Sequence, residues 1–214
     1  MSQPETINPD LAASAAILRH GGILLAPSET CFIFAADATN PIPIQRIFQI
    51  KKRPGIPSGI LVRDIEMAAR YAVIEPWQIE FIRHFWPGPL SCVFPRRNNL
   101  PDILTAQNSG VAMRQSPYPF WISMFDLIDF PITATSANQH GKPELYDLNL
   151  LSTQFSRNQL ADVTIIDSLP LPAQAPSTVL DMQCFPPRII RSGPVTADTI
   201  NPAILRFSPT PMEF

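Results

Sequence analysis

Four cations stand at the predicted ends of secondary-structure elements that are far apart in the chain: Lys51, Arg53, Arg114 and Arg191. Hydroxyl and amide side chains stand at or beside other predicted element ends, namely at Thr30, Ser136, Asn138 and Ser177. Arginine binds phosphate and carboxylate oxygens through two parallel hydrogen bonds, and lysine adds a point charge. If these ends converge in the fold, the sequence predicts a pocket for an anionic ligand such as a polyphosphate.

Each of these residues, taken alone, also fits an ordinary structural role. The run from Lys51 to Arg53 could be the solvated last turn of a helix, where unpaired carbonyl groups favour cations. Arg114 could pair with Asp102 or Asp126. Ser136 could cap a turn. These roles stay open for single residues, whereas a shared ligand explains the whole set.

The elements that would position these residues are short strands alternating with helices. Apolar and β-branched runs predict strands at residues 23–26, 31–35, 59–62, 91–94, 111–114, 131–138, 163–167, 177–181 and 188–191. Helical spacing and capping residues predict helices at about residues 9–20, 44–53, 64–71, 76–85 and 199–207. The alternation predicts one α/β domain over residues 1–214, with a twisted, mostly mixed sheet flanked by helices. Its core would span about residues 8–195, and residues 196–214 would form a C-terminal helix and tail.

Composition narrows the classes of function. The chain has 214 residues, a net charge of −2 and a pI of about 5.9, so no overall positive field favours tight RNA binding. With 25 prolines and 8 glycines, it has neither a GxGxxG nor a Walker-type glycine loop to hold a nucleotide. The three cysteines form no CxxC pair, so no zinc site is expected. We expect a cytoplasmic protein without a signal peptide, a membrane span or a metal site of its own.

A series of short blocks resembles, in the same order, the signature blocks of the threonylcarbamoyl-AMP synthase family, the YrdC-like proteins. The blocks are Pro27-Ser28-Glu29-Thr30, Lys51-Lys52-Arg53-Pro54, Phe85-Trp86-Pro87-Gly88-Pro89-Leu90, Val111-Ala112-Met113-Arg114, Thr135-Ser136-Ala137-Asn138, Ser177-Thr178-Val179 and Ile190-Arg191-Ser192-Gly193. The chain resembles the short single-domain form of that family.

The resemblance implies a concave cationic cavity and a nucleotidyltransferase reaction. L-Threonine, bicarbonate and ATP would give threonylcarbamoyl-AMP and pyrophosphate, and a downstream transferase complex would use the product to modify adenosine 37 of tRNA. Mg²⁺ would arrive on the ATP phosphates. Carried over by position, the threonine-binding residues would be Thr30, Arg114 and Ser177. The ATP-binding residues would be Lys51, Arg53, Ser136, Asn138 and Arg191, with Lys51 and Arg53 catalytic.

The sequence also departs from the family pattern. Cys31-Phe32-Ile33-Phe34 stands where Val-Tyr-Gly-Leu is typical, and Ser168-Leu169-Pro170-Leu171-Pro172 replaces a glycine-rich run. Pro57 stands where a polar side chain usually faces ATP. Two alternatives therefore stay open: a relative that makes another carbamoyl adenylate, and a non-catalytic RNA-binding module. Direct but weak tRNA binding is a further option.

Overall fold

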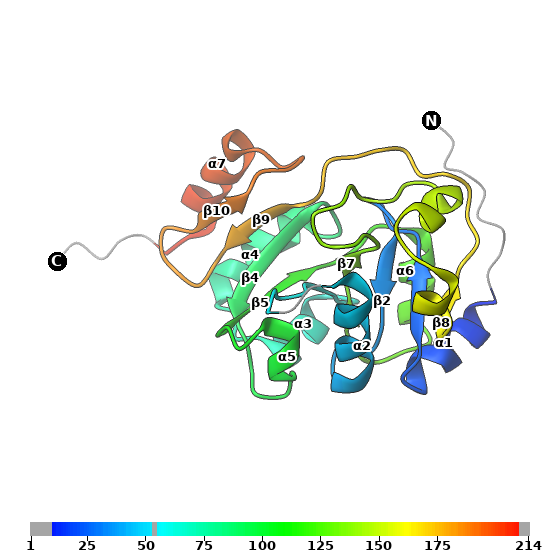
Figure 1. The fold of residues 1–214 in the computed structure, drawn as a ribbon. Helices are drawn as coiled ribbons and strands as arrows, with labels where there is room; N and C mark the ends of the chain where they lie inside the picture. The colour runs from blue at the N-terminus through cyan, green and yellow to red at the C-terminus, as the bar shows by residue number, and fades with distance from the viewer. Residues whose placement is uncertain (1–9, 53–54, 210–214) are drawn as a thin grey trace.

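The structure, a computed structural model, describes residues 10–52 and 55–209. Its strands form two sheets (Figure 1). The four-stranded sheet has the order β7-β2-β1-β8, formed by Thr135–Ser136, Ile33–Ala35, Ile23–Ala26 and Val163–Ile165. The six-stranded sheet has the order β10-β9-β4-β5-β3-β6, formed by Arg188–Arg191, Thr178–Asp181, Leu90–Pro95, Gly110–Arg114, Ile60–Leu61 and Ile132–Thr133.

Both sheets mix parallel and antiparallel pairs. Strand β1 runs antiparallel to β2 and parallel to β8. Strand β4 runs antiparallel to β5, with Cys92 opposite Met113, and parallel to β9, with Leu90 opposite Thr178. The predicted mixed α/β class is therefore confirmed.

The helices follow the capping signals of the sequence. They are α1 (Leu11–Arg19), α2 (Pro41–Lys51), α3 (Ile65–Tyr71), α4 (Pro76–Phe85), α5 (Asp102–Thr105), α6 (Pro119–Phe125) and α7 (Ala197–Phe207), with 3₁₀ turns η1 (Leu148–Thr153) and η2 (Arg157–Leu160). Asp10, Asn40 and Asp64 cap α1, α2 and α3 by accepting backbone N–H groups. In the part of the chain described, no helix has the length and apolar character needed to cross a bilayer.

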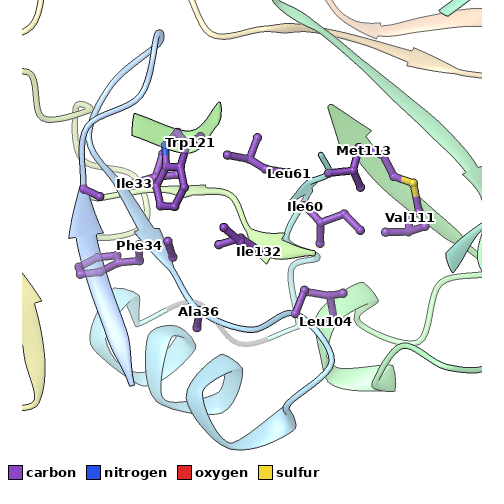
Figure 2. Packing of buried hydrophobic residues seen from close by; sticks show 14 of the residues in the cluster. Ile33, Phe34, Ala36, Ile60, Leu61, Leu104, Val111, Met113, Trp121 and Ile132 are labelled. Carbon is purple, nitrogen blue, oxygen red and sulfur yellow. The ribbon is translucent and has the colours of Figure 1, made fainter. Parts of the chain in front are cut away.

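The core joins the two sheets. Figure 2 shows side chains from both sheets meeting, with Ile132 of β6 between Phe34 of β2 and Ile60 of β3, and Trp121 of α6 beside them. The exposed fractions of these side chains are close to zero. Burial of such residues is the main favourable contribution to folding, at roughly 1.5–3 kcal/mol for each large apolar side chain.

Three details differ from the sequence prediction. The strands divide between two sheets, because the chain passes from β6 to β7 across the single residue Ala134 and pairs with a different sheet on each side. Helix α2 ends at Lys51 and not at Arg53, because Lys52 adopts a left-handed backbone conformation with φ of 50°. Helices α5 and α6 also form where the sequence predicted none.

Candidate active site

A cavity of about 230 Å³ lies where the two sheets meet. Its wall contains Ile33 and Ser136 from the four-stranded sheet and Ile60, Arg114 and Arg191 from the six-stranded sheet. The predicted site residues in this wall are Thr30, Arg114, Ser136, Ser177 and Arg191. Segments spread over more than half of the chain thus converge on one cavity, which contains five of the eight residues that the sequence predicted to meet.

Ser28 shapes the loop that places Thr30 in the wall. The Ser28 hydroxyl donates to the Cys31 carbonyl at 2.6 Å and accepts the Thr30 and Cys31 backbone N–H groups, both at 3.3 Å. Ser28 is only 2% exposed, so these contacts are shielded from water. The loop therefore presents the Thr30 hydroxyl, which lies 3.1 Å from the Ser28 hydroxyl, at a fixed position.

Arg114, the last residue of β5, pairs with Glu29. Its Nη1 lies 2.5 Å from Glu29 Oε1, and Ser116 donates a hydrogen bond to Glu29 Oε2 at 2.6 Å. Asp102, one of the partners considered from the sequence, pairs with Arg96 instead. The two atoms in contact, Arg114 Nη1 and Glu29 Oε1, are both buried and lack a partner with hydrogen-bond geometry in the described ranges. Arg114 is thus held in the cavity wall by its charge pair with Glu29.

Ser177, just before β9, and Arg191, at the end of β10, contact each other. Arg191 Nε and Nη2 donate to the Ser177 carbonyl at 3.1 and 2.8 Å, and Nη2 also lies 3.1 Å from the Ser177 hydroxyl. The β9–β10 register shifts between Ile189 and Arg191, and such irregularities re-aim side chains. A Cβ atom on Gly193 would lie 2.4 Å from the Pro176 carbonyl oxygen, so this close approach requires glycine.

Lys51 lies behind the cavity wall and is 1% exposed. Its Nζ donates to the Asn138 carbonyl at 2.8 Å, to Asn138 Oδ1 at 3.2 Å and to the Ser136 carbonyl. The Ser136 hydroxyl donates to Asn138 Oδ1 at 2.6 Å. Lys51 and Asn138 are not part of the cavity wall; they fix the loop that carries Ser136. Lys51 is therefore a buried residue and not a solvated C-terminal cation, while Arg53 lies outside the described residues.

The charges of the wall are more balanced than the sequence suggested. Glu144 lines the cavity beside Arg114 and Arg191, so the two cations face one carboxylate. Desolvation lowers the pKa of Arg191 from its usual value, while the charge of Glu144 acts in the opposite direction. Burial, assisted by the charge of Glu144, raises the pKa of the Cys31 thiol to about 12. Cys31 therefore stays a neutral thiol at physiological pH and does not act as a thiolate nucleophile.

Sequence reasoning missed three polar members of the wall, Ser58, Ser91 and Glu144. Ser91 lies 2.9 Å from Ser177, hydroxyl to hydroxyl, because β4 and β9 are parallel neighbours. Glu144 is a single acid between a proline and a leucine, so neither its spacing nor its neighbours indicate a site. Among the residues that the structure describes, no group of three or more His, Cys, Asp or Glu side chains could hold a metal ion.

Comparison with known proteins places this geometry in a family. The sequence matches the Sua5/YciO/YrdC family, described as telomere recombination, over residues 16–193. A threonylcarbamoyl-AMP synthase from Pyrococcus abyssi is 30% identical over 193 residues, which is 89% of this chain and 56% of that protein. A threonylcarbamoyl-AMP synthase from Bacillus subtilis is 28% identical over 202 residues, which is 93% of this chain and 58% of that protein. The chain therefore spans less than two thirds of the length of these two relatives.

Solved structures agree with the sequence match. The crystal structure of P. abyssi Sua5 complexed with L-threonine superposes with a TM-score of 0.83 at 29% identity, covering 91% of this chain and 57% of that one. The structure of E. coli YciO superposes with a TM-score of 0.74 at 20% identity, which shows a shared fold, and covers 90% of this chain and 96% of that one. The family match covers most of the chain, and the resemblance seen in the sequence is confirmed: the chain belongs to the Sua5/YciO/YrdC family.

Proposed function

We propose that the protein is an L-threonylcarbamoyladenylate synthase. It would form threonylcarbamoyl-AMP and pyrophosphate from L-threonine, bicarbonate and ATP, for modification of adenosine 37 of tRNA. The observation that carries this proposal is the convergence of Thr30, Arg114, Ser136, Ser177 and Arg191 on one cavity. The names of the relatives and the threonine complex of P. abyssi Sua5 support it.

The geometry supports a division of the cavity between the two substrates. Thr30, Arg114 and Ser177 would bind threonine, with the guanidinium of Arg114 on its carboxylate. Ser136 and Arg191 would bind ATP. Lys51 and Asn138 would support ATP binding by holding the Ser136 loop, to which Lys51 donates its hydrogen bonds. The role proposed for Arg53, contact with the phosphates, rests on the sequence blocks alone.

The reaction suits a site with this composition. The amine of threonine takes up carbon dioxide, and an oxygen of the resulting carbamate attacks the α-phosphorus of ATP. The bond between the α-phosphorus and its bridging oxygen breaks, and pyrophosphate leaves with the electron pair. A weak nucleophile of this kind benefits most from alignment and from charge neutralisation on the phosphates. Fixed arginine and hydroxyl groups provide both, and no thiolate is required of Cys31.

Mg²⁺ would be bound mainly by the phosphates of ATP. Magnesium keeps several of its waters and usually takes one or two carboxylates together with substrate phosphates. Glu29, a carboxylate next to the cavity, is already paired with Arg114 and hydrogen-bonded by Ser116. We therefore assign the metal to the nucleotide and not to a protein cage. The cytoplasmic location and the downstream transferase complex stay predictions.

The RNA-binding alternative has less support from the surface charges. Arg46, Arg70 and Arg83 are each paired with a carboxylate on the surface, which leaves fewer cations for a phosphate backbone. A different carbamoyl adenylate is the main competing product. Solved HypF chains share the fold at 20% identity, which indicates fold alone.

The decisive experiment is incubation of the purified chain with ¹⁴C-bicarbonate, L-threonine and MgATP, followed by chromatography. A labelled adenylate that requires threonine supports the proposal. A labelled adenylate that forms without threonine would indicate another carbamoyl adenylate, and no labelled adenylate under conditions in which a known synthase works would refute the assignment. A thermal-shift assay separates the remaining alternative, since stabilisation by RNA alone would favour an RNA-binding module.

A further inference from the structure

Glu144 is a carboxylate that the family resemblance does not assign to any role. It lines the same cavity as Arg114 and Arg191 and is partly exposed to it. In the described part of the chain it forms no ion pair within 4.0 Å, although its charge influences both Arg191 and Cys31. A carboxylate that faces a cavity and forms no direct ion pair can bind a cationic group of a ligand.

The backbone around Glu144 is fixed on both sides. The carbonyl of Leu145 accepts the backbone N–H of Phe32 at 3.0 Å, which ties this segment to the loop that carries Thr30. The carbonyl of Pro143 accepts a hydrogen bond from Gln154 Nε2 at 2.8 Å. Glu144 is therefore held at the wall by the fold and does not reach it on a free loop.

Tyr146 fixes the side chain of Glu144. Its hydroxyl lies 2.9 Å from Glu144 Oε2 and 3.1 Å from the Gln174 carbonyl, and it can donate its single hydrogen to one of them at a time. Desolvation, together with the hydrogen bond that the hydroxyl donates to Glu144, raises the pKa of Tyr146 to about 12, so the hydroxyl keeps this hydrogen. The contact leaves Oε1 of Glu144 for a ligand.

The cavity thus presents two opposite charges at separate points of its wall. Arg114 lines the cavity with a positive guanidinium, and Glu144 lines it with a carboxylate whose Oε2 is hydrogen-bonded by Tyr146. A zwitterion that carries an anionic and a cationic end fits such a wall better than a simple anion, because each end meets its complement. An α-amino acid is the smallest common metabolite of this kind.

We propose that Glu144 binds the amino group of the amino-acid substrate while Arg114 binds its carboxylate, so that Glu144 selects for a free amine. The inference rests on the proposed function, because it takes the substrate of this cavity to be an α-amino acid. It goes further by naming a residue of the cavity wall that selects the substrate. It also gives a role to a carboxylate that lies next to a site that must accept phosphates.

The test compares two ligands in two proteins. The ligands are L-threonine and 2,3-dihydroxybutanoate of the same configuration, in which a hydroxyl replaces the amine. Binding to wild type and to Glu144→Gln is measured by isothermal titration calorimetry without ATP. A charge-assisted hydrogen bond changes affinity by about tenfold or more. We expect Glu144→Gln to weaken threonine binding by at least about tenfold and to change dihydroxybutanoate binding by less than about threefold.

Two controls separate a binding role from a general effect. Glu66→Gln removes an exposed acid of α3, outside the cavity wall, and should leave both affinities unchanged. Tyr146→Phe keeps the carboxylate but removes the hydroxyl beside it, and should weaken threonine binding less than Glu144→Gln does. Equal melting temperatures of the variants would exclude misfolding.

Each other outcome overturns the inference in a distinguishable way. If Glu144→Gln binds threonine as tightly as wild type, Glu144 is not the amine site, and the proposed function is untouched. If the variant changes affinity for MgATP and not for threonine, Glu144 acts on the nucleotide or its metal. If wild type itself binds no amino acid, the proposed function fails and the inference fails with it.

Discussion

The ion pair between Arg114 and Glu29 allows a quantitative test of how burial changes the strength of a charge interaction. The side chains are 7% and 15% exposed, and their nearest N and O atoms are 2.5 Å apart. Removal of one partner from a buried pair leaves an uncompensated charge, which destabilises a protein by about 3–5 kcal/mol. We therefore expect Glu29→Gln to lower the free energy of unfolding by about 3 kcal/mol, even though glutamine matches glutamate in shape.

The chain contains a matched control with different burial. Arg83 and Glu80 of α4 also approach to 2.5 Å, but their side chains are 60% and 55% exposed. Exposed pairs contribute only about 0.2–1 kcal/mol, because water screens the charges and side-chain entropy opposes the contact. Glu80→Gln should therefore change the free energy of unfolding by less than about 1 kcal/mol.

Urea unfolding of each single and double variant, analysed as a double-mutant cycle, gives the coupling energy of each pair. The Glu29→Gln/Arg114→Gln double variant should recover part of the stability that either single variant loses. Equal coupling energies for the buried and the exposed pair would refute the reasoning, because they would show that the distance between the charges matters and their burial does not.

The remaining predictions concern the loop, the thiol, the glycine and the substrate. Lys51→Met should lower both the melting temperature and the affinity for ATP, because it releases the Ser136 loop. Lys52→Ala, at the exposed neighbouring position, should change neither. Calorimetry measures the melting temperature, and nucleotide titration measures the affinity. The pKa of Cys31 is raised to about 12 in the folded state, so the thiol of the unfolded state loses its proton first as the pH rises. The free energy of unfolding should therefore fall from about pH 9 upward. Urea unfolding should show that it falls less steeply with pH in Cys31→Ala. Gly193→Ala should weaken threonine binding several-fold by displacing the backbone next to Ser177, and unchanged binding would contradict this account of the close approach. Threonine should be preferred over serine by about 1 kcal/mol through contact of its methyl group, as measured by competition between the two amino acids.

The sequence predicted the convergence of the site because its residues stand at the ends of strongly patterned elements. Arg114 ends β5 and Arg191 ends β10, and both strands were predicted at the observed residues. Ser177 stands one residue before β9. Strand ends on one edge of a sheet meet in space, so residue types at those ends carried enough information to predict a pocket.

Features that depend on pairing between distant segments could not be predicted in the same way. The sequence around Lys51 is typical of a solvated helix end, yet its ammonium group is buried and donates to the carbonyl groups of residues 136 and 138. Glu144 reaches the wall only because Leu145 pairs with Phe32. The partner of Arg114 is Glu29, an acid in another loop; its place beside Thr30 distinguished it from Asp102 and Asp126, but the pairing itself depends on the fold.

At Ala134 the polypeptide leaves one sheet and joins the other, and this crossing lies at the wall of the cavity. Separation of the two sheets would break backbone hydrogen bonds next to this crossing, including those from Ala134 to the Gly59 carbonyl at 2.8 Å and from Thr133 to the Ala36 carbonyl at 2.9 Å; Ala134 and Gly59 border the cavity. A ligand that touches both halves would act as a clamp across this crossing. Amide hydrogen exchange at positions 59 and 134 should therefore slow on ligand binding more than exchange in distant strands does, and would report occupancy of the cavity in the absence of turnover.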